Sequence, residues 1–221
     1  MKMRFMMLLL CVLLAGCAAA QNQAAESAQA ETVLAEENNV QILPLQDTTM
    51  EMMEDSTVHI SMEQGDFYRD ASGNVVLRMQ VYSYDKFDMV DISLLKAGDT
   101  ILLSGEEIPV DSVERTENGT VLVNGGLDEG GFDLATDDSG IYFVHGYNDM
   151  KSWYLVGEAE YPVADEFAFT DGADLERGAI TYGAEDILAE LPEAAYGYQP
   201  QNTMVRIENG QVVAMERIFM P

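Results

Sequence analysis

The sequence predicts a mainly β protein, an antiparallel sandwich or barrel-like domain with one short helix near the C-terminal end. After residue 55 the chain consists of short runs in which apolar and polar residues alternate, separated by Gly, Asn and Asp. Such alternation is typical of antiparallel strands. The dipeptides Asn118-Gly119 and Asn209-Gly210 each lie between two such runs, where they predict hairpin turns. There is no alternation of strands with helices and no internal repeat, so a parallel α/β fold and a solenoid are both disfavoured.

The clearest strand spans residues 75–84, where apolar residues at odd positions alternate with Arg78 and Gln80. A turn at 70–74 is expected to join it to a strand within 57–68, and 85–96 has room for a short helical turn. The helix is expected over 184–191, where Pro192 ends it. The remaining strands are expected at 100–103, 108–116, 120–124, 132–136, 141–145, 153–161, 166–170, 204–208 and 211–219.

The first seventeen residues have the pattern of an export signal. Lys2 and Arg4 precede an apolar run that is too short for a transmembrane helix, and the run ends in Leu14-Ala15-Gly16-Cys17. This cluster resembles the lipobox of bacterial lipoproteins. The resemblance implies cleavage after Gly16 and acylation of Cys17, which would anchor the protein to the extracytoplasmic face of the cell membrane. Where a cell has two membranes, Ala18 after the cysteine resembles an outer-membrane sorting context.

The remainder of the chain is strongly acidic. Without the signal, nine Lys and Arg remain against thirty-nine Asp and Glu. This balance argues against nucleic acid as a partner and against docking on anionic head groups, so the lipid is expected to provide the membrane attachment. Cys17 is the only cysteine left, which excludes an intramolecular disulfide.

We therefore expect three regions: the signal at 1–16, the lipidated N-terminus with an acidic flexible tether at 17–54, and one β-rich globular domain at 55–221. The tether assignment follows from its composition, because residues 18–54 contain no aromatic residue, glycine or basic charge.

Calcium is the one cofactor that the composition suggests. Hard cations bind several oxygen ligands, and residues 124–140 combine acidic side chains with five glycines. The spacing does not match an EF-hand, and acidic hairpin tips are commonly plain solvated turns. The candidate ligands are Asn124, Asp128, Glu129, Asp133, Asp137 and Asp138.

The candidate ligand-binding residues are the aromatic residues Tyr147, Trp153 and Tyr154. Exposed rings on a β domain stack on sugars, although most aromatic residues of such domains belong to the core. His59 and His145 lack the spacing of a zinc site and are expected to be structural.

No nucleophile motif and no glycine-rich phosphate loop is present in the sequence. We therefore expect a lipid-anchored envelope protein whose β domain binds a saccharide or an envelope protein, or has a structural role. The alternative is a hydrolase of envelope polymers or sugars that uses paired carboxylates, with or without calcium.

Overall fold

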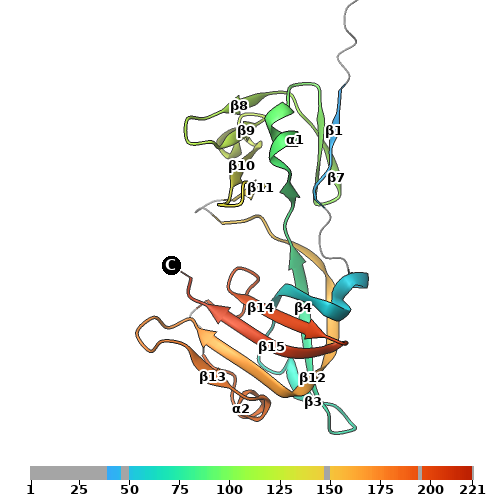
Figure 1. The fold of residues 1–221 in the computed structure, drawn as a ribbon, viewed down its shortest axis with the longest axis vertical. Coiled ribbons are helices and arrows are strands. Elements are labelled where there is room, and N and C mark those ends of the chain that lie inside the picture. The colour runs from blue at the N-terminus through green and yellow to red at the C-terminus, as the bar shows by residue number, and fades with distance from the viewer. Residues whose placement is uncertain (1–38, 46–49, 147–149, 194–195, 221) are drawn as a thin grey trace, which may run out of the picture. The chain divides into compact units, whose positions relative to one another are not determined.

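The protein is mainly β, and its architecture includes a closed five-stranded barrel. The structure is a computed structural model that describes residues 39–45, 50–146, 150–193 and 196–220 (Figure 1). Residues 39–221 form one compact unit. Within the described residues, no helix has the length and apolar character needed to span a membrane.

The barrel is built from β2, β4, β12, β14 and β15, with β3, β13 and α2 attached to it. Their bounds are β2 (Ser56–Ser61), β3 (Phe67–Arg69), β4 (Val75–Ser83), β12 (Tyr154–Gly172), β13 (Ile180–Tyr182), α2 (Ala184–Ala189), β14 (Thr203–Glu208) and β15 (Gln211–Ile218), and the 3-10 helix η1 (Met50–Asp55) precedes β2.

The long strand β12 closes the barrel because it pairs with two different neighbours. Its first half, Tyr154 to Pro162, is antiparallel to β4, and its second half, Val163 to Gly172, is parallel to β15. Strand β15 pairs with β14, β14 with β2, and β2 with β4, so the ring is complete (Figure 1).

The ring has the connectivity of an OB-type barrel. If the five strands are numbered 1 to 5 in chain order, from β2 to β15, they follow one another around the ring in the order 1-2-3-5-4-1. The single parallel pair joins strands 3 and 5, and helix α2 lies between strands 3 and 4 in the sequence. The second and third strands of the ring are β4 and β12.

Between β4 and β12 the chain forms a second lobe. Its elements are β5 (Lys86–Phe87), α1 (Met89–Leu94), β6 (Thr100–Leu103), β7 (Glu106–Pro109), β8 (Val113–Arg115), β9 (Val121–Val123), η2 (Leu127–Glu129), β10 (Phe132–Thr136) and β11 (Tyr142–His145). They form a five-stranded sheet in the order β5-β11-β10-β9-β8, while β6 and β7 form a sheet with β1 (Gln41–Ile42). The lobe has its own core around Phe87, Ile92 and Leu134, separate from the barrel core.

Residues 39–45 and 50–54, assigned to the tether from composition, contribute structure to the compact unit. Ile42 is buried in the core of the second lobe, where β1 runs parallel to β6. Met53 is fully buried in the barrel core. These isolated apolar residues are too few to form a periodic pattern, which explains why the sequence alone places the boundary at Asp55.

The expected alternation is confirmed in β4, where Leu77, Met79 and Val81 point into the barrel core. The two Asn-Gly dipeptides form different turns. Asn209 and Gly210 both have positive φ, as a two-residue type I′ hairpin requires. In Asn118-Gly119 only the glycine has positive φ, because this loop has three residues, 117–119, between the paired Thr116 and Thr120.

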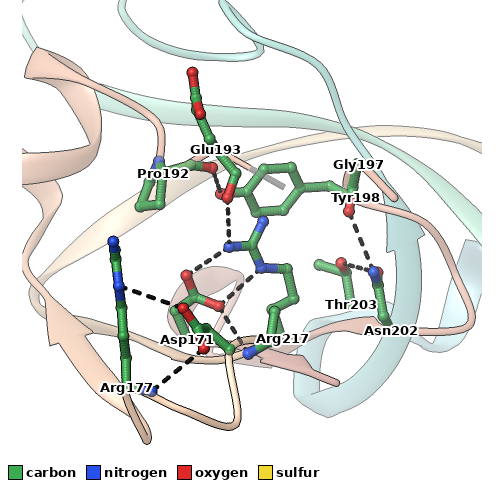
Figure 2. A network of polar contacts seen from close by, with 11 residues as sticks. Asp171, Arg177, Pro192, Glu193, Gly197, Tyr198, Asn202, Thr203 and Arg217 are labelled. Atoms are coloured by element: carbon green, nitrogen blue, oxygen red, sulfur yellow. Dashed lines mark hydrogen bonds and ion pairs between the residues drawn. The ribbon is translucent and has the colours of Figure 1, made fainter. Parts of the chain in front are cut away.

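A buried ion pair crosses the parallel pairing of β12 with β15 (Figure 2). Asp171 and Arg217 are register partners, with distances of 2.8 Å from Nε to Oδ1 and 2.5 Å from Nη2 to Oδ2. Arg217 is 2% exposed, and its Nη2 also donates to the carbonyl of Glu193. The guanidinium carbon lies 4.5 Å from the ring centroid of Tyr198, a cation–π arrangement.

We expect the substitution Asp171→Asn to lower the free energy of unfolding by about 3–5 kcal/mol, because it leaves the guanidinium of Arg217 buried without its counter-ion. The double variant Asp171→Asn, Arg217→Met removes both charges and is expected to recover most of that loss. Urea unfolding measures both. Equal destabilisation of the single and the double variant would show that the charge imbalance is not the cause.

Tyr198 provides a pH-dependent contribution to stability. Burial raises the pKa of its hydroxyl to about 12, and this hydroxyl donates to the carbonyl of Pro192 at 2.8 Å. Because an exposed tyrosine has a pKa of about 10, the contribution is complete below about pH 10 and is lost as the pH rises toward 12. Between pH 9 and pH 11 we expect the unmodified protein to lose more unfolding free energy than the variant Tyr198→Phe. Parallel losses in denaturant titrations at the two pH values would contradict this assignment.

Candidate functional site

The residues predicted to bind calcium are used mainly to build turns. Asn124 accepts through Oδ1 from the backbone amides of Asp111 and Ser112, and it donates to the carbonyl of Pro109. Asp133 accepts from the amide of Leu127. These contacts use oxygen atoms that a cation would need.

Asp137 caps the turn between β10 and β11 by accepting from Ser139 and from the amide of Ile141. The hydroxyl of Ser139 and these backbone donors hold the pKa of Asp137 below its usual range. Asp128, Glu129 and Asp138 are exposed. Among the described residues, no three His, Cys, Asp or Glu side chains converge to hold a metal ion, so calcium binding stays a prediction without geometric support.

Two of the three predicted aromatic residues lie in the described part of the chain. The ring of Trp153 packs against His59 at a centroid distance of 4.4 Å and against Tyr84 at 4.8 Å. Tyr154 begins β12, where it pairs with Ser83. Tyr147 and Cys17 lie outside the described residues.

This aromatic cluster adjoins one end of a mostly polar surface on the barrel, which we call the outer face. It comprises side chains that point away from the core on three adjacent strands. They are His59 and Ser61 on β2, Arg78, Gln80 and Tyr82 on β4, and Leu155, Glu158 and Glu160 on β12.

The pairing register brings these residues together. Ser61 and Glu158 are both register partners of Gln80, and Glu160 is the partner of Arg78. Directly paired residues of antiparallel strands have side chains on the same side of the sheet. The surface is therefore defined by the same alternation that places Leu77, Met79 and Val81 in the core.

Hydrogen bonds hold the polar side chains of this surface in place. The hydroxyl of Tyr82 donates to Oε1 of Gln80 at 2.9 Å, and Ser61 donates to the same oxygen at 3.3 Å. Because Gln80 accepts through Oε1, its amide Nε2 is the donor that it can offer to a ligand. The side chains around Gln80 are thus arranged before any ligand arrives.

A second group lies beside it. Tyr68, on β3, donates from its hydroxyl to Oε2 of Glu160 at 2.7 Å, and Arg78 lies 3.4 Å from the same oxygen. The hydrogen bond to Glu160 raises the pKa of the Tyr68 hydroxyl. Arg78 also lies over the Tyr68 ring, 5.3 Å from its centroid.

The outer face is hollowed around Gln80. A depression of about 450 Å³ has a lining that includes Ser61, Glu63, Asp66, Arg78, Gln80, Tyr82, Glu158 and Gln199. The lining offers hydroxyl, amide, guanidinium and carboxylate groups, and the rings of Tyr82, Trp153 and Tyr68 lie nearby. This arrangement suits a ligand that is rich in hydroxyl groups and also has apolar faces.

Two carboxylates among the described residues do not meet the requirements of the hydrolase alternative, which stays a prediction. A general acid needs a carboxyl group whose pKa is raised, in partnership with a second carboxylate at a defined separation. Asp70 and Asp137 have pKa values shifted in the opposite direction, since the Asn74 side chain and backbone amides stabilise the charged form of Asp70.

Sequence reasoning did not single out the outer face. The polar positions Arg78 and Gln80 were visible as the exposed side of a strand, which is a common feature of any half-buried sheet. The sequence does not indicate which strands lie beside β4. Glu158 and Glu160 are far from Gln80 in the sequence, and only the pairing of β4 with β12 brings them close to it.

Comparisons of the chain with protein-family models, with curated proteins and with solved structures found no match.

Proposed function

We propose that the protein is a lipid-anchored, exported binding protein whose outer face takes a neutral oligosaccharide of the cell envelope. The observation that carries the proposal is the preorganised polar surface around Gln80, with its depression and the adjoining aromatic rings. The lipobox-like cluster at Cys17 supports export and anchoring.

The chemistry of the surface supports a sugar. Sugar hydroxyl groups both donate and accept, and the outer face supplies the acceptors Glu158 and Glu160 together with the donors Arg78 and the Gln80 amide. Sugar rings also have apolar C–H faces that stack on aromatic side chains. Trp153 and Tyr82 are only partly buried, so their rings are available for such stacking.

The charges of the surface argue against an anionic ligand. Glu63, Asp66 and Glu158 line the depression, whereas Arg78 is the one cation among the lining residues and is itself paired with Glu160. Phosphate groups and uronic acids would be repelled by this balance. A neutral oligosaccharide would not be repelled.

The OB-type connectivity of the ring supports, by analogy, the location of the binding surface on β4 and β12. Barrels of this class bind oligosaccharides and oligonucleotides on the face of the second and third strands. A fold hosts many functions, so the analogy points to a surface and leaves the ligand to the side chains.

Oligosaccharide binding is testable with residues 18–221, the chain that follows Cys17. We expect at least one neutral oligomer of N-acetylglucosamine, glucose or mannose to bind in calorimetric titrations, and an oligogalacturonate of the same length not to bind. The variant Gln80→Ala removes a hydrogen-bonding side chain and is expected to weaken binding about fivefold, which corresponds to about 1 kcal/mol. The matched control Gln211→Ala alters an exposed glutamine on β15 and should bind normally.

Binding that is unchanged in Gln80→Ala, or that favours the anionic oligomer, would contradict the assignment of the outer face. Failure of every neutral oligomer to bind would reject a saccharide as the ligand.

Membrane attachment through Cys17 is tested separately. In the native cell we expect the intact chain to sediment with membranes and the variant Cys17→Ser to remain unprocessed or to be released, because the serine hydroxyl does not form the thioether. Immunoblotting of membrane and soluble fractions measures this. The control Cys11→Ser changes a thiol within the apolar run and should leave the processed, anchored form intact. Membrane-bound Cys17→Ser protein of the processed size would disprove lipidation at this residue.

A further inference from the structure

The barrel has a second concave surface, which the proposed function does not use. An open cleft of about 1100 Å³ lies between the loop that follows β12, helix α2 and the end of β15. Asp171 and Arg217 line it, and its walls include Leu175, Ile180, Pro192 and Phe219. This surface, which we call the C-terminal cleft, is formed by different residues from the outer face.

The C-terminal cleft exposes an unusual amount of apolar side chain. Leu175 is 70% exposed, and Phe219 and Ile180 are 41% and 38% exposed. Single exposed apolar residues need no explanation, but several that line one concavity are typical of an interaction site.

The rim of the C-terminal cleft is acidic. Asp174 forms an ion pair with Arg177, and Asp171 forms one with Arg217. The other carboxylates that line the cleft are Glu176, Asp186, Glu190 and Glu193, and within the described residues none of these four forms an ion pair with a basic side chain. The rim therefore has uncompensated negative charge around an apolar interior.

The guanidinium of Arg217 does not offset the charge of the rim. It is buried and paired with Asp171, and its Nη1 is covered and has no hydrogen-bond partner among the described residues (Figure 2). A partner that enters the cleft therefore meets the charge of the rim carboxylates.

We propose that the C-terminal cleft binds a basic amphipathic peptide segment of a partner protein, in which Lys or Arg side chains flank apolar ones. The apolar side chains would contact Leu175 and Phe219, and the cations would contact the rim carboxylates. A second copy of this chain is disfavoured as the occupant because nine basic residues face thirty-nine acidic ones after the signal. Residues 18–38 contain no Lys or Arg, so the chain's own N-terminal segment lacks the required charge.

The test uses residues 18–221 and a blocked hexapeptide of alternating lysine and leucine, measured by fluorescence polarisation at low and physiological salt. We expect the triple variant Glu176→Gln, Glu190→Gln, Glu193→Gln to weaken binding at least tenfold. The control triple variant Glu106→Gln, Glu114→Gln, Glu117→Gln removes the same charge from exposed positions of the second lobe and should change the affinity less than twofold. Leu175→Ser should also weaken binding several-fold, since the lost contact is apolar.

The probes distinguish a site from general attraction to an acidic surface. A hexapeptide of alternating lysine and serine, with the same charge, is expected to bind at least tenfold more weakly than the lysine–leucine peptide. Equal weakening by the two triple variants, or full affinity in Leu175→Ser, would overturn the proposal. Binding of neutral oligosaccharides should be unchanged in all these variants, so failure here is distinguishable from failure of the outer face.

Discussion

The fold depends on the double pairing of β12. A strand that is antiparallel to β4 in its first half and parallel to β15 in its second half joins two hairpin-like parts of the chain into one closed ring. The register shifts near Leu155 and between Val163 and Ala168 allow it to bend as it passes from one neighbour to the other. Both concave surfaces follow from this strand. Its first half supplies Glu158 and Glu160 to the outer face, and its end supplies Asp171 to the C-terminal cleft.

Several of the few basic residues serve the structure directly. Arg217 is buried against Asp171, and Arg115 donates to the carbonyls of Ile92, Ser93 and Leu95 at the C-terminal end of α1. Lys151 donates to the hydroxyl of Tyr84. Since these cations are engaged within the fold, much of the negative charge on the surface is left uncompensated. A ligand of the outer face is therefore expected to be neutral, and a partner of the C-terminal cleft to be cationic.

Local features of the fold were predictable from the sequence, whereas its closure was not. Alternation identified β4, the turn residues identified the hairpins, and Pro192 marked the end of the region that contains α2. The parallel pairing of β12 with β15 joins residues far apart in the sequence, and no local pattern encodes such a contact. The contribution of residues 39–45 and 50–54 was missed for a related reason, since Ile42 and Met53 are single buried residues in polar stretches of the sequence.

The same distinction applies to the site residues. The acidic residues of 124–140 were conspicuous by composition, yet Asn124, Asp133 and Asp137 serve mainly as acceptors for backbone amides. Trp153 was singled out as an aromatic residue, and its position beside the outer face emerged only from its packing against His59 and Tyr84. Gln80 has no distinctive sequence context, and its candidacy rests on neighbours from β2 and β12.

The most direct test of the central claim is an amide ¹H–¹⁵N correlation map of residues 18–221, recorded during titration with the neutral oligosaccharide that binds most tightly. The account predicts saturable shifts in the amides of 78–82 and 155–160, with those of 173–178 and 189–193 unmoved. Shifts confined to the second lobe or to the C-terminal cleft would contradict the assignment of the outer face as the saccharide-binding surface.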